Sequence, residues 1–295
     1  MDEVARPQAA STMLPTSSLR DALYGFGICI AALLAAAIFF WLLADLARQG
    51  VGRLDWTFLT TPPRNAGRDG GLAPILVSTF LIIFVAMSVA APLGVATAIF
   101  LSEFTPAGGR LARWMSLSLD VLAGTPSIVF GLFGGAFFCV FLGLGFSILS
   151  GGMTLACMAL PILIRTVESG LRSSPIEWRL GAAALDLSRA TLLWHVLLPA
   201  AAPSLAAGLS LGIGRAVAET AALIFTSGYV DRMPSSLFDS GRALSVHIYD
   251  LTMNVSGGDA NAYASALVLI AFLIAANSLA FWLSNRIFGR RMARA

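Results

Sequence analysis

The sequence predicts an all-α integral membrane protein with six membrane-spanning helices. Of the 295 residues, 57% are hydrophobic and 12% are charged, which is too apolar for an ordinary soluble protein. No charged side chain occurs between residues 121 and 164. Several apolar runs reach the roughly 20 residues that a helix needs to cross a bilayer. Together these observations indicate a helical protein that lies mostly in lipid.

Five polar separators divide the chain into six apolar runs. In order they are the turn-rich loop 48–71, the loop 103–113, the Gly-rich reversal 143–152, the charged segment 171–198 and the polar loop 230–261. The first run is too long for a signal-peptide core, so we expect an uncleaved helix there. The expected spans are 24–43, 72–101, 115–142, 153–169, 204–228 and 262–283. They form one membrane domain over residues 22–290, with its core at 72–285, between tails at 1–21 and 291–295.

The arginines predict the orientation of the spans. Six spans place both ends of the chain on one side of the membrane. If that side is the cytoplasm, twelve arginines lie in inner segments and six lie in outer loops. Positive charge is enriched on the cytoplasmic side of membrane proteins. We therefore expect cytoplasmic termini and a cytoplasmic segment at residues 171–198.

The composition also excludes several kinds of chemistry. All nineteen basic residues are arginines, and without lysine the chain has neither a Walker A phosphate loop nor a Schiff-base residue. The two histidines and three cysteines lack metal-ligand spacing, so we expect no metal, cofactor or catalytic set. Membrane lipid is the expected surrounding, and no nucleic-acid partner is expected. Any energy for transport must come from a partner protein or from a gradient.

The charged segment 171–198 predicts two short helices outside the membrane. In residues 174–177, a serine precedes a proline and a glutamate follows three residues after the serine, which is the pattern of a capping box at a helix start. Asp186 or Ser188 can cap the second helix, which is expected to end at Pro199. Helices this short need a partner surface, either in this chain or on another protein.

Two features inside the predicted spans are candidates for function. Arg215 and Glu219 lie four residues apart, on one face of the fifth span and near its middle. The pair either faces a water-filled path or neutralises itself and locks helices together. Residues 125–127, Thr-Pro-Ser, predict an interruption of the third span, which either lines a cavity or is an ordinary proline kink.

Several stretches of the sequence resemble a known family. Residues 214–223 (GRAVAETAAL) and 122–131 (LAGTPSIVFG) resemble the fifth-helix and third-helix motifs of phosphate-importer permeases. Residues 56–63 and 70–71 resemble the first external loop of these permeases. Residues 236–238, 247–249 and 262–269 resemble the C-terminal part of the PstA-type subunit. The resemblance implies the MetI-like fold of an ABC-importer permease in a bacterial inner membrane, with pathway residues Thr125, Ser127, Arg215, Glu219 and Thr220.

The cytoplasmic segment resembles the coupling loop of ABC-importer permeases, which docks into the ATPase subunit. The family pattern reads Glu-Ala-Ala, three residues, Gly, nine residues, Ile-x-Leu-Pro. Aligned on its last proline, the pattern implies a coupling loop at residues 171–199, with Gly181, Ala182, Ala183, Asp186 and Pro199 as its residues. Leu180 stands in place of the glutamate, Gly181 in place of the first alanine, and Asp186 in place of the glycine.

By resemblance, the chain is half of the pore of an ATP-driven phosphate importer and is not itself an enzyme. The implied partners are a second permease of the PstC type, a dimer of PstB-type ATPases and an external phosphate-binding protein of the PstS type. Two alternatives stay open at this point. The importer could carry another oxyanion, or the chain could be a proton-coupled secondary transporter with Arg215 and Glu219 as its relay. The docking segment and the lack of an inverted repeat disfavour the second alternative.

Overall fold

The computed structural model describes residues 19–106, 108–284 and 286, so the expected tails fall largely or wholly outside it. The chain divides into two compact units, Met1–Leu46 and Ala47–Ala295. The first unit contains most of α1 (Leu19–Gly50), an apolar helix long enough to cross a membrane. This agrees with the expected first span. All further elements belong to the second unit.

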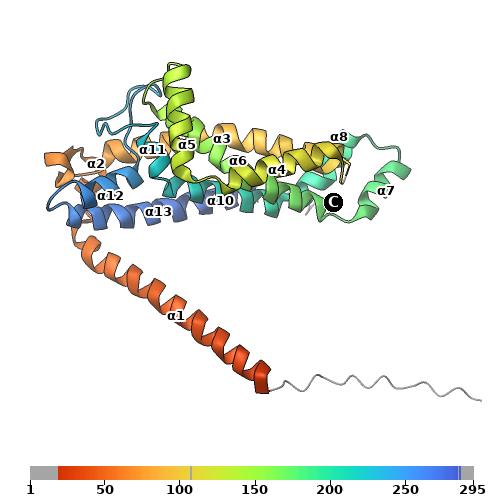
Figure 1. Cartoon of the computed structure of the whole chain (residues 1–295), viewed down its shortest axis with the longest axis horizontal. Helices are drawn as coiled ribbons and strands as arrows, with labels where there is room; N and C mark the ends of the chain where they lie inside the picture. Colours follow the sequence, from red (N-terminus) through yellow and green to blue (C-terminus); the bar gives the residue numbers. More distant parts are fainter. Residues whose placement is uncertain (1–18, 107, 285, 287–295) are drawn as a thin grey trace, which may run out of the picture. The chain divides into compact units, whose positions relative to one another are not determined.

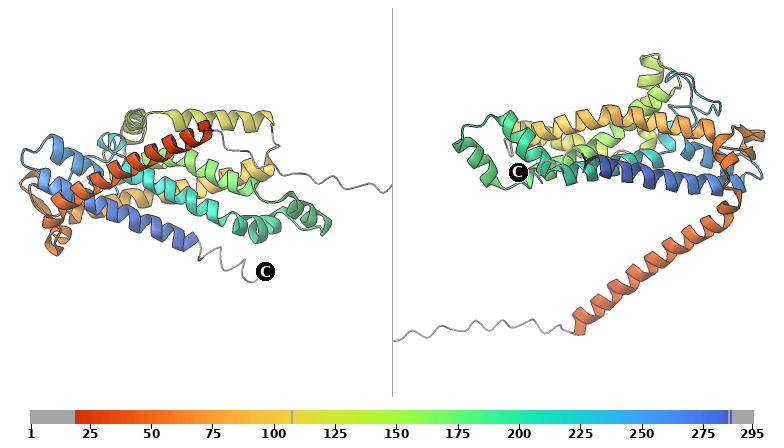
Figure 2. Two further views of the ribbon diagram at one scale, coloured as in Figure 1. Left: turned by 90° about the horizontal axis from the view of Figure 1, so that it is seen from below. Right: turned by 180° about the vertical axis from the view of Figure 1, so that it is seen from behind.

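Four long helices lie side by side in the second unit (Figures 1 and 2). The central pair is α3 (Ala73–Ile99), which continues as the π-helical turn η3 (Phe100–Phe104), and α6 (Ile148–Arg172). Helix α10 (Ala202–Ala218) packs on both of them, and α13 (Asp259–Ser284) packs on α10. The expected second, fourth and sixth spans therefore form, each within a few residues of its predicted bounds.

The third span breaks where the sequence predicts an interruption. Helix α4 (Arg110–Gly124) is followed by α5 (Ser127–Gly134), which continues as the π-helical η4 (Gly135–Phe141). The axes of the two parts differ by 100°, and Figure 1 shows α5 standing across the other helices. Thr125 adopts extended backbone angles, as expected for a residue before proline. The expected span over residues 115–142 is therefore a bent pair of helices, interrupted where the sequence predicts.

The fifth span is also broken, which the sequence analysis did not predict. Helix α10 ends at Ala218, Glu219 has an extended backbone with φ −73° and ψ 128°, and the short helix α11 (Ala221–Ile224) follows. The Ser245 hydroxyl donates a hydrogen bond of 2.6 Å to the Glu219 carbonyl oxygen and so satisfies a group that the break releases. One continuous helix over residues 204–228 is therefore wrong.

Four helices among the described residues are long and apolar enough to cross a membrane. The number rises to six if each of two bent pairs counts as one span. One pair is α4 with α5 and η4. The other joins residues 189–200 to α10 with a bend of 66° at Ala201. The all-α membrane fold is thus confirmed, with four to six candidate spans among the described residues.

The charged segment 171–198 forms short helices, as expected, although their ends differ from the prediction. Helix α7 (Ile176–Ala184) begins directly after Pro175, and no side chain caps its N-terminus, so the predicted capping box is wrong. Helix α8 (Arg189–Leu192) is capped by Ser188, whose hydroxyl accepts a 3.1 Å bond from the amide of Thr191.

The chain stays helical beyond α8, through the π-helical η5 (Leu193–Leu197) and α9 (Leu198–Ala200). Pro199 therefore lies inside a helical turn. The prediction that the second helix ends at Pro199 is wrong. The helical direction changes only at Ala201.

Small elements cover the opposite end of the bundle from α7 and α8 (Figure 1). The loop before α3 contains η1 (Val51–Arg53), α2 (Trp56–Thr60), β1 (Pro63–Arg64), η2 (Asn65–Gly67) and the antiparallel partner β2 (Asp69–Gly70). Helix α12 (Leu244–Met253) lies within the polar loop 230–261, where no helix was expected. The Asn261 amide donates 2.8 Å bonds to the carbonyls of Gly67 and Arg68 and ties the two loops together.

Candidate functional site

The two breaks in the bundle meet each other, because α5 packs against α11. Glycine makes the contact close: a Cβ added at Gly131 would lie 2.9 Å from the Cα of Ala222, and one at Gly135 would lie 3.0 Å from the carbonyl oxygen of Phe225. Small residues at helix interfaces allow the two backbones to approach in this way. The first residue of α5 is thereby held beside the break that follows α10.

Arg215 and Glu219 face each other across this break. A guanidinium nitrogen of Arg215 lies 3.7 Å from a carboxylate oxygen of Glu219, and the side chains are 38% and 13% exposed. The two residues were expected on one helical face. In the structure Glu219 is the first residue beyond α10, so only Arg215 lies on the helix. The Nε atom of Arg215 is buried, with no hydrogen-bond partner within the described part of the chain. The guanidinium thus keeps donor capacity that Glu219 does not use.

The other expected pathway residues flank this pair. The Ser127 hydroxyl lies beside the Glu219 carboxylate, so it joins the cluster directly. Thr220 follows Glu219 within the break. The Thr125 hydroxyl instead donates a 2.8 Å bond to the Val121 carbonyl of its own helix. The structure therefore brings Ser127, Arg215 and Glu219 together and leaves Thr125 turned back into α4.

The coupling loop surrounds an open cavity of about 580 Å³. Ala182, Ala183 and Asp186 contribute to its lining, whereas Gly181 has open space around its Cα and Pro199 is buried. Six large apolar side chains between residues 176 and 194 are exposed, namely Ile176, Trp178, Leu180, Leu185, Leu187 and Trp194. Several exposed apolar side chains outside the membrane spans are typical of a protein contact.

The backbone explains why a glycine is usual at the position of Asp186. Asp186 has φ +51°, in the left-handed region that glycine adopts most easily. The Leu187 amide donates to the Ala182 carbonyl at 2.9 Å, and the Asp186 amide donates to the Ala183 carbonyl at 3.2 Å. This is a Schellman motif, which ends α7 with a left-handed residue. Aspartate is among the few other residues that tolerate this conformation, so the departure from the family pattern keeps the turn.

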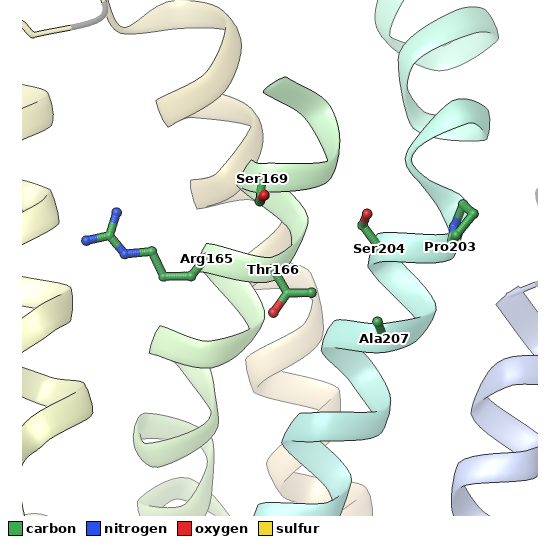
Figure 3. Close-up of a pocket in the computed structure, with 6 residues that line it drawn as sticks. All are labelled: Arg165, Thr166, Ser169, Pro203, Ser204 and Ala207. Carbon is green, nitrogen blue, oxygen red and sulfur yellow. The ribbon is translucent and has the colours of Figure 1, made fainter. Parts of the chain in front are cut away.

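A groove of about 540 Å³ between α6 and α10 is lined by several hydroxyl side chains that the sequence analysis did not single out (Figure 3). Thr166, Ser169 and Ser204 lie between the two helices, whereas the Arg165 side chain extends away from α10. Arg165 reaches α4, where it makes a 2.7 Å ion pair with Asp120. The two partners are 45 residues apart, so no local sequence pattern could reveal the pair.

Comparison with known proteins identifies relatives over most of the chain. Residues 90–294 match the family described as "Binding-protein-dependent transport system inner membrane component". The probable ABC transporter permease protein YqgI of Bacillus subtilis is 32% identical over 287 residues, which cover 91% of this chain and 95% of the relative. The phosphate transport system permease protein PstA of Mycobacterium leprae is 30% identical over 289 residues, covering 94% and 93%.

A solved structure shares the fold of this chain. It is an inward-facing MetNI methionine ABC transporter, with a TM-score of 0.52 and 20% identity over 75% of this chain and 94% of the other. At this identity the likeness concerns the fold alone.

Proposed function

Because the chain belongs to the family of binding-protein-dependent transport system inner membrane components, we propose that it is one permease half of an ATP-driven importer of inorganic phosphate. The membership makes it an ABC-importer permease of the MetI type. Phosphate as the substrate is supported by relatives named PstA at 30% to 35% identity. The lack of lysine, and hence of a Walker A loop, supports an ATPase on a separate chain.

The observation that carries the proposal is the cluster of Arg215, Glu219 and Ser127 at two meeting helix breaks. Non-helical backbone at membrane depth is tolerated where it lines a cavity or is buried in protein. The guanidinium offers a fork of donors that matches phosphate oxygens, and Glu219 holds it when no anion is present. Phosphate then meets Arg215 only transiently, because tight binding would prevent release.

The importer proposed here contains further subunits. Permeases of this type work with an ATPase and a binding protein. We propose that the partners are a PstC-type second permease, a PstB-type ATPase dimer and a PstS-type external binding protein. The chain lies in a bacterial inner membrane with both termini in the cytoplasm. The placement of α7 and α8 at one end of the bundle and of α2 and α12 at the other supports this orientation.

Isolation of the complex tests the composition, and uptake tests the substrate. Copurification through a tag on this chain should recover an ATPase and a second permease. Cells that express the complex should take up labelled phosphate in competition with unlabelled phosphate and arsenate, and sulfate should not compete. Uptake that sulfate or molybdate inhibits instead would favour another oxyanion. Uptake without any ATPase would favour the secondary transporter.

A further inference from the structure

A half-buried ion pair joins helix α7 to the inner end of α3. The Arg179 guanidinium donates one hydrogen bond to each carboxylate oxygen of Glu103, with nitrogen–oxygen distances of 2.7 and 3.2 Å. The two side chains are 22% and 14% exposed. A forked contact of this kind fixes both the distance and the angle between its partners. Because Glu103 lies in η3 and Arg179 in α7, the pair links two elements that are 76 residues apart in sequence.

The same guanidinium also binds the chain that leads from α6 into α7. Arg179 donates a 3.0 Å bond to the Leu171 carbonyl and a 3.2 Å bond to the Ser174 carbonyl. One side chain therefore holds three segments together, namely the end of α6, the start of the cytoplasmic segment and η3.

A second arginine strengthens the contact between α6 and η3. Arg172 donates a 2.7 Å bond to the Leu101 carbonyl and pairs with Glu168 at 2.9 Å. Leu101 lies in the π-helical turn, where the hydrogen bonds skip one residue more than in an α-helix. The ends of α3 and α6 are thus fixed to each other before α7 begins.

Helix α7 has little apolar packing that could position it instead. Ala182 is its one buried residue among those described, and Ile176 and Leu180 are 59% and 63% exposed. A Cβ added at Gly181 would contact nothing within 4 Å. The position of α7 relative to the bundle therefore depends on the polar contacts of Arg179.

We propose that Arg179 is a positioning residue whose ion pair with Glu103 makes α7 move as one rigid body with the inner ends of α3 and α6. A displacement of α7 then moves the core pair of helices and, through them, the broken helices at Arg215. Without the Arg179–Glu103 ion pair, α7 moves alone and the helices of the bundle are not displaced. The inference rests on the proposed function in one respect, since the ATPase supplies the displacement.

Charge reversal in the complete complex tests the role of the Arg179–Glu103 ion pair. The complex with its ATPase, second permease and binding protein is reconstituted in vesicles, and ATP hydrolysed per labelled phosphate imported is measured. Arg179→Glu and Glu103→Arg should each raise this ratio at least tenfold, while the ATPase copurifies in the wild-type amount. The swap of both residues should restore part of the coupling, because the ion pair forms again while the bonds from position 179 to the Leu171 and Ser174 carbonyls stay lost. Arg113→Glu, a reversal at an exposed site on α4, is the matched control and should leave the ratio unchanged.

Milder variants keep the test decisive if a reversal prevents assembly. Glu103→Gln and Arg179→Lys each retain part of the contact and should raise the ratio about threefold, with thermal unfolding shifted little. An unchanged ratio in these assembled variants, or a swap no better than the single reversals, would overturn the proposal. If the wild-type complex hydrolyses ATP but imports a different oxyanion, the phosphate assignment fails and the same ratio is measured with that anion.

Discussion

Single residues explain where this chain departs from its family pattern. Asp186 stands in place of a glycine and occupies the left-handed conformation that the Schellman motif requires. Gly181 replaces an alanine at a site where a Cβ would contact nothing. Both residues thus fit the backbone of the coupling loop that the structure shows. The sequence alone could reveal the departures, and the backbone angles were needed to show that the loop accommodates them.

Asp186 gives the first prediction. A side chain in the left-handed region costs roughly 1 kcal/mol relative to glycine. Asp186→Gly should therefore raise the thermal unfolding temperature of the purified protein by about 2 to 4 °C, and Asp186→Val should lower it. Phosphate uptake should be unaffected by the glycine. Equal stability of the glycine and valine variants would contradict the assigned backbone conformation.

His247 gives a prediction for the end of the bundle opposite α7 and α8, in α12 and outside the candidate membrane spans. Burial lowers the pKa of His247 to about 4, and the nearby positive charge of Arg242 acts in the same direction. The unfolded chain, with a histidine pKa near 6.5, binds this proton more readily than the folded chain. Stability should therefore fall as the pH drops from about 6.5 to 4, by about 3 kcal/mol in all.

The measurement for His247 is thermal unfolding of the purified protein between pH 7 and pH 4. His247→Gln should show a smaller loss of stability across this range than the wild type, because its side chain does not titrate. Parallel curves for the two proteins would mean that His247 is not the group responsible.

At the scale of elements, the two broken helices differ in how far the sequence predicts them. Pro126 predicts the break in the third span, because the residue before a proline avoids helical angles. The break at Glu219 has no such local signal. It depends on the hydrogen bond from Ser245 and on the packing of α5 against α11, which are contacts between distant parts of the chain. For this reason the sequence placed Glu219 within a continuous helix, whereas the structure places it at a break.

The coupling helices give a prediction at this scale. Ala183 lies on α7 at the wall of the open cavity, where a carboxylate would meet the docking ATPase without a partner. Ala183→Asp should leave the permease folded and uncouple ATP hydrolysis from uptake. The measurement is ATP hydrolysis and labelled phosphate uptake in the same vesicles, with Gly181→Ala as the control. Unchanged uptake in Ala183→Asp would place the docking surface elsewhere.

At the scale of the whole molecule, the sequence predicted the class of fold and the order of the spans. Apolar runs and the turn residues between them suffice for that, because a helix in lipid must satisfy its own backbone. The packing order of the helices and the ion pairs Arg165–Asp120 and Arg179–Glu103 could not be predicted, since each joins residues far apart in the chain.

Topology is testable at the same scale. Single cysteines at Asn65 and Gly257, in a version of the chain without its own cysteines, should react with a membrane-impermeant reagent in intact cells. A cysteine at Ser188 should react only after the cells are opened. The reverse pattern of labelling would place the α7–α8 end outside and would exclude contact with an ATPase.

The central claim is that Arg215 meets the transported anion at the meeting helix breaks, and paired neutral variants test it most directly. ATP-driven uptake of labelled phosphate is measured in reconstituted complexes that carry Arg215→Gln, Glu219→Gln or both. Arg215→Gln should abolish uptake while assembly and external phosphate capture persist. The double variant should stay inactive, because no cation remains to meet the anion. If the pair only neutralised itself, removing both charges would restore uptake, and that result would contradict the account.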